Sequence, residues 1–142
     1  GEILSINPAV INSLLRDDFV PVISPVAGDK GGNTYNINAD IAAVEIAISL
    51  NASKLVFLTD IEGIREQADN ADSLISSISP IKALDMIKTG NIKGGMIPKT
   101  ECCIKAVQNG VESVHIINGK ISHSILLEIY TKDGIGTVME ED

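Results

Sequence analysis

Residues 54–59 read Lys-Leu-Val-Phe-Leu-Thr and form an unbroken, mostly apolar run that ends directly at Asp60. A run without polar alternation is typical of a strand that is covered on both faces, as in a parallel sheet. Two other segments have the same character, namely Phe19-Val-Pro-Val-Ile-Ser24 and Ser113-Val-His-Ile-Ile117. We therefore predict buried strands at all three places, and a last short strand from Ile135 to Met139.

Helix patterns and glycine-rich turns fill the chain between these runs. Ala27 to Thr34 contains several glycines and predicts an exposed loop or hairpin tip. The helix expected from Ala39 to Leu50 is apolar almost all round, which indicates burial on more than one side. The other expected helices span residues 7–16, 80–89, 98–109 and 123–130, with Ser122 as the cap of the last. This alternation predicts one α/β domain over residues 1–142, a three-layer sandwich with a mainly parallel open sheet covered by helices on both faces.

The composition limits the classes of protein to which the chain can belong. It has 142 residues, of which 44% are hydrophobic and 21% charged, as in an ordinary globular domain. Aromatic residues make up 3% and the net charge is −8, so binding to nucleic acid or to an anionic membrane is not expected. We find no secretory signal and no apolar run of about 20 residues, the length of a membrane span. Cys102 and Cys103 are adjacent and predict reduced thiols in a cytoplasmic protein.

The residues that follow the strands carry functional information, because ligands of open α/β sheets bind outside the carboxyl ends of the strands. Thr59-Asp60-Ile-Glu-Gly63 comes at the end of the run at 54–59. Its aspartate could order a lysine, a metal-bound water or a ribose hydroxyl, and it could equally form an Asx-turn or a helix cap. The residues alone leave both interpretations open.

A second pattern surrounds the start of the helix expected near Pro98. Gly94 and Gly95 let the backbone approach a ligand closely, and the first turn of a helix offers unpaired N–H groups to an anion. Lys99 lies in that turn, where a cation opposes the helix dipole unless an anion is bound. We interpret the segment as an anion site, with a glycine-rich turn and a solvated lysine as the alternative.

Polar residues also precede the most apolar helix. Asn38 suits the N-cap, but a cap does not account for Asn36 as well, or for Asp40 ahead of an apolar stretch. A capped helix start and a group of ligand-facing side chains remain equal interpretations. His115 and His123 have no further ligand at metal-binding spacing, so we expect both to be structural and expect no protein metal site.

Taken together, these segments resemble the C-terminal half of the N-acetylglutamate kinases, which belong to the amino acid kinase family. The resemblance covers almost the whole chain from about Ile6 onward, and the matching motifs come in the order of the family. The motifs are Phe19-Val-Pro-Val-Ile-Ser-Pro25, Tyr35-Asn-Ile-Asn-Ala-Asp40, Leu58-Thr-Asp-Ile-Glu-Gly63, Gly94-Gly-Met-Ile-Pro-Lys99 and Gly134-Ile-Gly-Thr137. Each motif is ambiguous by itself, whereas the ordered set is specific.

The resemblance implies phosphoryl transfer from ATP to the side-chain carboxylate of N-acetyl-L-glutamate, a step of arginine biosynthesis. By motif position, Lys99 would neutralise charge on the transferred phosphoryl group and Asp40 would orient the catalytic lysines, while Asn36 and Asn38 would bind the acceptor. The implied nucleotide-binding residues are Thr59, Asp60, Gly63, Gly94, Gly95, Met96 and Lys99. Mg²⁺ would be held mainly through the phosphates of ATP, without a cage of protein ligands.

Enzymes of this kind are about twice as long as this chain. Their N-terminal half carries a first catalytic lysine on a glycine-rich loop, a Gly-Gly substrate loop and much of the acceptor pocket, and this sequence has none of these. We therefore expect the acceptor-binding half to be absent and the fragment to have little or no kinase activity alone. Two other interpretations stay open: a kinase of the same fold that acts on another acceptor, such as carbamate, aspartate or glutamate, and a non-catalytic ligand-binding module.

The end of the chain resembles the regulatory segment of the arginine-inhibited members. In those enzymes a glutamate and a glycine six residues later contact the inhibitor, and Glu128 and Gly134 have this spacing. The alternative is a helix end with a solvated glutamate and a turn glycine. We expect L-arginine to inhibit the full-length enzyme, which we also expect to be a homo-oligomer.

Overall fold

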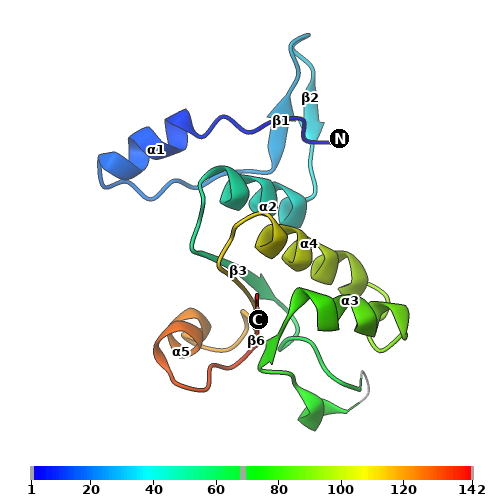
Figure 1. Ribbon diagram of the computed structural model, residues 1–142. Helices are drawn as coiled ribbons and strands as arrows, with labels where there is room; N and C mark the ends of the chain where they lie inside the picture. Colours follow the sequence, from blue (N-terminus) through cyan, green and yellow to red (C-terminus); the bar gives the residue numbers. More distant parts are fainter. Residues whose placement is uncertain (1, 68–69, 142) are drawn as a thin grey trace.

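A computed structural model describes residues 2–67 and 70–141 of the chain, in which helices and strands alternate (Figure 1). The helices are α1 (Ala9–Arg16), α2 (Ala39–Ser49), α3 (Pro80–Lys88), α4 (Met96–Gln108) and α5 (Ser124–Tyr130), with a 3-10 turn at Ala71–Ser73. The strands are β1 (Val26–Gly28), β2 (Thr34–Asn36), β3 (Lys54–Thr59), β4 (Ser77–Ile78), β5 (Ser113–Asn118) and β6 (Thr137–Glu140). The predicted hairpin between residues 27 and 34 is confirmed, because β1 and β2 pair antiparallel around this turn.

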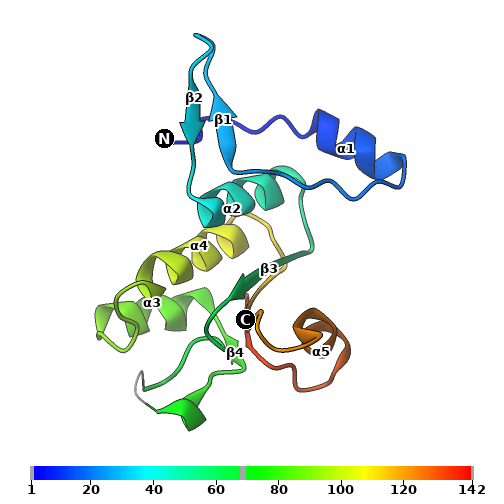
Figure 2. The ribbon, with the colours of Figure 1, turned by 180° about the vertical axis from the view of Figure 1, so that it is seen from behind.

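The main sheet has the strand order β3-β5-β6-β4. Strands β3 and β5 are parallel, as are β4 and β6, whereas β5 and β6 are antiparallel. Helices α2, α3 and α4 lie on one side of this sheet and α5 on the other (Figures 1 and 2). Five successive residues of β5, from Ser113 to Ile117, are buried, which requires that both faces of the sheet are covered. The predicted three-layer α/β sandwich with a mainly parallel sheet is therefore confirmed.

Strand β3 is less buried than the sequence indicated, whereas the burial of α2 agrees with its pattern. Strand β3 forms as predicted, but only Phe57 of its residues is buried and Leu58 is 56% exposed, because β3 is the edge strand of the sheet. Helix α2 buries Ala42, Val44 and Ala47 against the rest of the domain, while Ile41 is 43% exposed. Ala42 and Val44 are two positions apart and therefore lie on opposite sides of the helix, so the prediction that it is buried on more than one side is confirmed.

The strand predicted at Phe19–Ser24 is also wrong. These residues form neither helix nor strand, and Val20 and Val22 are 88% and 97% exposed. A strand needs a neighbour to accept its hydrogen bonds, and no described segment pairs with this one. Pro21 and Ile23 instead line a shallow groove with α2 and with Leu55 of β3. An apolar, β-rich segment thus lies on the surface next to the open edge of the sheet.

Helix starts differ from the predictions in two places. Helix α4 begins at Met96, with Pro98 in its first turn rather than at its start. Helix α5 begins at Ser124 after His123, which has a left-handed backbone with φ of 59°, so Ser122 is not the cap. The first helical pattern is confirmed as α1, and the core is mostly aliphatic. Cys103 is part of that core, and burial raises the pKa of its thiol to about 12, which suits an inert packing role.

Candidate active site

Lys99 and Asp40, which are 59 residues apart in sequence, form an ion pair between α4 and α2. The Nζ atom of Lys99 lies 2.6 Å from Oδ2 of Asp40, and the two side chains are 19% and 36% exposed. Asp40 is held in place because Asn38 caps α2, with its Oδ1 accepting hydrogen bonds from the backbone N–H groups of Asp40 and Ile41. The structure therefore brings the two predicted catalytic residues together.

Phe57 of β3 is a third member of this cluster, and sequence analysis missed it. The ammonium group of Lys99 lies over its ring, 5.1 Å from the ring centroid. An aromatic face attracts a cation and replaces part of the hydration that the cation loses on partial burial. The ring and the Asp40 carboxylate thus contact the ammonium group from two different elements. The only signal in the sequence was that Phe57 is the one aromatic residue in its strand.

For a full-length protein with the kinase activity that the resemblance implies, Phe57→Leu should lower kcat about threefold, because Lys99 loses its cation–π contact. The KM for MgATP is expected to change less than kcat if the ring acts on Lys99 alone. Phe57→Met, which also lacks a ring but fills the core differently, should give the same decrease. Steady-state kinetics and thermal unfolding of both variants check this. If the variant with the lower melting temperature also has the lower kcat, the loss comes from destabilised packing and the role of the ring is contradicted.

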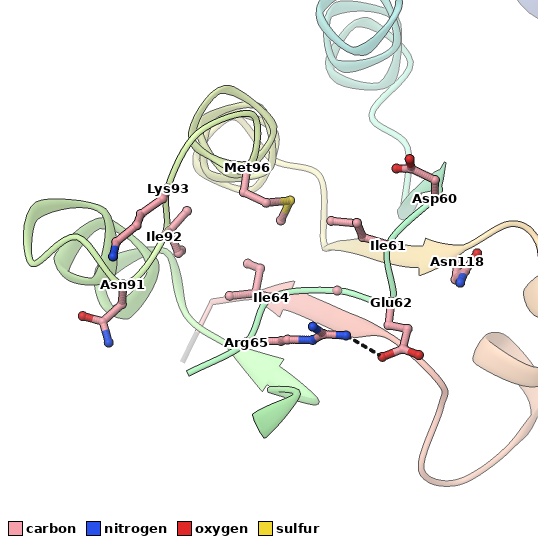
Figure 3. A pocket seen from close by; sticks show the side chains of 11 residues that line it. Asp60, Ile61, Glu62, Ile64, Arg65, Asn91, Ile92, Lys93, Met96 and Asn118 are labelled. Carbon is pink, nitrogen blue, oxygen red and sulfur yellow. Dashed lines mark hydrogen bonds and ion pairs between the residues drawn. The ribbon is translucent and has the colours of Figure 1, made fainter. Parts of the chain in front are cut away.

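A pocket of about 290 Å³ lies between the end of β3 and the start of α4 (Figure 3). This is near the lower end of the ~300–1,000 Å³ typical of small-molecule sites. Three of the residues predicted to bind nucleotide, Asp60, Gly63 and Met96, line this pocket. The same wall holds an ion pair between Arg65 and Glu62, with 3.2 Å between Nη2 and Oε2.

Other predicted nucleotide residues flank this pocket along the chain. The hydroxyl of Thr59 donates to the carbonyl of Ile61 and accepts from its N–H, so it shapes the turn. Gly94 has a left-handed φ of 56° and Gly95 is the residue before α4, so the pair forms the turn that leads into the helix. Neither glycine borders the pocket itself, whereas Lys93 does. Residues that line it without having been predicted are Ile61, Glu62, Ile64, Arg65, Asn91, Ile92, Lys93 and Asn118.

Thr137 of β6 ties the loop after β3 to the sheet. Its hydroxyl accepts a hydrogen bond from the Ile64 N–H at 2.8 Å and donates to the carbonyl of Ile75 at 2.6 Å. A side chain at Gly63 would collide with that hydroxyl, so only glycine permits this close approach. The glycine at this pocket therefore has a packing role, whatever ligand it contacts.

The predicted acceptor residues, Asn36 and Asn38, directly precede α2. Asn36 is exposed at the end of β2, where it pairs with Val26 of β1. Asn38 is exposed as well, and because its Oδ1 caps α2, only its amide NH₂ group is left for a ligand. The cap interpretation of Asn38 is thus confirmed, while contact of either asparagine with a substrate stays a prediction.

Glu128 and Gly134 lie next to each other, apart from the Lys99 cluster. Glu128 is 9% exposed, and its Oε1 is 2.7 Å from Nδ1 of His115. Its Oε2 accepts hydrogen bonds from the N–H groups of Ile135 and Gly136 at 2.7 and 3.0 Å. A Cβ atom at Gly134 would come within 2.8 Å of the same oxygen. The alternative of a solvated glutamate is therefore wrong, and His115 has the structural contact expected of it.

The residues of the chain match the family model of the amino acid kinase family over positions 1–118. The chain belongs to the amino acid kinase family. Among its relatives is the acetylglutamate kinase of Archaeoglobus fulgidus, 51% identical over 140 residues, which are 99% of this chain and 48% of that protein. The chain spans about half the length of the curated relatives that it matches first.

Solved structures agree with this assignment. N-acetylglutamate synthase from Neisseria gonorrhoeae, in complex with coenzyme A and N-acetylglutamate, matches with a TM-score of 0.87 and 29% identity over 94% of this chain and 30% of that chain. The same synthase in complex with coenzyme A and L-arginine gives a TM-score of 0.83, with 27% identity over 96% of this chain and 31% of that chain. Carbamate kinase from Giardia lamblia, at 22% identity and a TM-score of 0.72 over 98% of this chain and 46% of that chain, shares the fold. Within residues 2–67 and 70–141, no helix has the length and apolar character needed to cross a membrane.

Proposed function

We propose that this chain is the nucleotide-binding part of an enzyme that phosphorylates the side-chain carboxylate of N-acetyl-L-glutamate with ATP. The observation that carries this proposal is the partly buried ion pair between Asp40 of α2 and Lys99, which lies in the first turn of α4 after the turn at Gly94 and Gly95. The identity of about 50% to acetylglutamate kinases supports the choice of reaction.

The chemistry requires charge neutralisation and positioning rather than a covalent enzyme intermediate. The ammonium group of Lys99 supplies a fixed positive charge for a phosphoryl group, and Asp40 holds it at the amino end of α4, where the helix dipole also favours anions. Among the described residues, no group of three or more His, Cys, Asp or Glu side chains could hold a metal ion. In this proposal Mg²⁺ enters with ATP and neutralises charge on its phosphates.

The acceptor pocket would be completed by a second half of the intact protein. The surface that supports this division is apolar and open: Phe19, Val20 and Val22 are exposed beside the free edge of β3. An open edge strand with apolar neighbours is a site where further chain pairs or packs. The 142-residue chain alone would then bind nucleotide weakly or not at all and would not turn over substrate.

The test is release of ADP by the full-length protein in the presence of N-acetyl-L-glutamate, glutamate, aspartate or carbamate. We expect turnover at or above about 1 s⁻¹ with N-acetyl-L-glutamate, the ordinary range of enzymes, and little with the other acceptors. The 142-residue chain, assayed beside it, should be inactive. A preference for another acceptor would replace the proposed substrate, and full activity of the fragment would overturn the division into halves.

Regulation by L-arginine is part of the same proposal. The synthase from Neisseria gonorrhoeae has been solved with L-arginine, and it shares 27% identity with this chain. Three of the roughly four acceptor positions of the Glu128 carboxylate are used within the chain, which leaves one on Oε1 for a guanidinium group. We propose an arginine-inhibited, cytoplasmic homo-oligomer. Activity of the full-length enzyme measured against rising L-arginine tests the inhibition, and an unchanged rate would reject it.

A further inference from the structure

The β1–β2 hairpin stands away from the main sheet, at the end of the molecule that carries α1 and α2 (Figures 1 and 2). Its strands pair at three positions, Val26 with Asn36, Ala27 with Tyr35 and Gly28 with Thr34. Every residue of β2 is exposed. A two-stranded hairpin of this size is marginally stable in water, so its order must come from its turn and from its two ends.

One carboxylate organises the turn. Oδ1 of Asp29 accepts hydrogen bonds from the N–H groups of Gly31 and Asn33 at 2.8 and 2.9 Å. Its Oδ2 accepts from the Asn33 side-chain amide at 2.8 Å and from the hydroxyl of Tyr35 at 2.9 Å. The Tyr35 contact differs from the others, because it reaches out of the turn to β2. Asp29 thus links the turn to the strand that follows it.

These donors keep the carboxylate charged. The side chain of Asn33, then its N–H group, then the Tyr35 hydroxyl lower the pKa of Asp29 to about 2. With both oxygens accepting from the chain itself, Asp29 is poorly suited to contact a ligand that is a dicarboxylate and carries negative charge. Its role is therefore in holding the hairpin.

The residues on either side of Asn36 are both held by hydrogen bonds. On one side, Tyr35 is bound to Asp29. On the other side, Ile37 is 5% exposed and its N–H donates to the Pro25 carbonyl at 2.9 Å. Asn36 lies between the two, so the backbone position of its amide depends on the contact at Asp29. If that contact is lost, the Ile37 end keeps its bond to Pro25, while the turn end is held by the short strand pairing without the side-chain link.

We propose that Asp29 is a positioning residue for acceptor binding, which ties the hairpin turn to Tyr35 and thereby fixes the place from which Asn36 contacts the acceptor. This inference rests on the proposed function, because Asn36 has an acceptor only if the protein phosphorylates one. Asp29 itself touches neither substrate.

The experiment is steady-state kinetics of the full-length enzyme with Asp29→Ala and Tyr35→Phe, each varied against N-acetyl-L-glutamate and against MgATP. Asp29→Ala should raise the KM for N-acetyl-L-glutamate about five- to tenfold, with kcat and the KM for MgATP within about twofold of wild type. Tyr35→Phe should raise the same KM by less. In the Asp29→Ala background it should add nothing, because the contact is already gone. Lys30→Ala, a loss of charge in the same turn, is the matched control and should leave all constants unchanged.

The possible outcomes distinguish failure of the positioning role from failure of the proposed function. An unchanged KM for N-acetyl-L-glutamate in both variants of an active enzyme overturns the positioning role alone. A wild-type enzyme that does not phosphorylate N-acetyl-L-glutamate overturns the proposed function and this inference with it. If Asp29→Ala lowers the melting temperature and changes every constant, Tyr35→Phe decides, because it removes a single exposed oxygen. Additive effects of the two substitutions also contradict the proposed link.

Discussion

Replacing Lys99 by alanine in the full-length enzyme should lower kcat by about 10²- to 10³-fold, the usual cost of removing one preorganised charge at a reacting group. The reason is that the ammonium group is held by Asp40 and Phe57 before substrate binds, so its charge is available without reorganisation. The fold should survive, because the Asp40 side chain is 36% exposed and its carboxylate can be hydrated once Lys99 is gone. Steady-state ADP release and thermal unfolding measure the two effects.

The chain offers a matched control for this substitution. Lys105 lies on the same helix and forms an ion pair with Glu45, so it too joins α4 to α2. Its side chain is 55% exposed, and an exposed ion pair contributes little to stability. Lys105→Ala should therefore leave kcat within about twofold of wild type. Equal losses of activity in the two variants would mean that the contact between helices matters and that Lys99 has no chemical role.

Much of the Lys99 site could be predicted from the sequence, because it depends on side chains at the starts of two helices, which local sequence determines. Asn38 has the side chain of a cap, and it caps α2. Lys99 opposes the dipole of its own helix, and the structure gives it the carboxylate of Asp40 as a partner. The contribution of Phe57 could not be predicted, because it depends on which strand comes within reach of the Lys99 side chain, and this is set by the tertiary packing.

The prediction at Phe19–Ser24 failed for a related reason. Composition identifies an apolar, β-rich segment, but a strand forms only beside another strand, and the partner must come from elsewhere in the chain. The same holds for β3, whose apolar run indicated burial on both faces although it lies at the edge of the sheet. Both errors mark the surface where we propose that the rest of the protein packs.

Glu128→Ala should destabilise the domain by about 3 kcal/mol, in the range found when one partner of a buried charged contact is removed. Three groups lose their acceptor at once: His115 and the N–H groups of Ile135 and Gly136. The two N–H groups belong to the segment that leads into β6, so the loss should loosen the connection between α5 and the sheet. Denaturant unfolding of the 142-residue chain and of the full-length protein measures it. Glu112→Ala, a loss of an exposed glutamate just before β5, is the control and should change stability little.

The same carboxylate predicts how stability depends on pH. Burial alone would raise the pKa of Glu128, but the hydrogen bonds from His115, Ile135 and Gly136 outweigh it and lower the pKa below its usual value of 4.5. A group with a lowered pKa in the folded state stabilises the protein above its unfolded pKa and loses that contribution as the pH falls through the folded one. The difference in unfolding free energy between wild type and Glu128→Gln should therefore be constant above about pH 5.5 and shrink below about pH 4.5. A difference that does not change with pH would mean that shape rather than charge holds the segment. In that case, weaker inhibition of a Glu128 variant by L-arginine would report altered packing of the segment and not a lost contact with arginine.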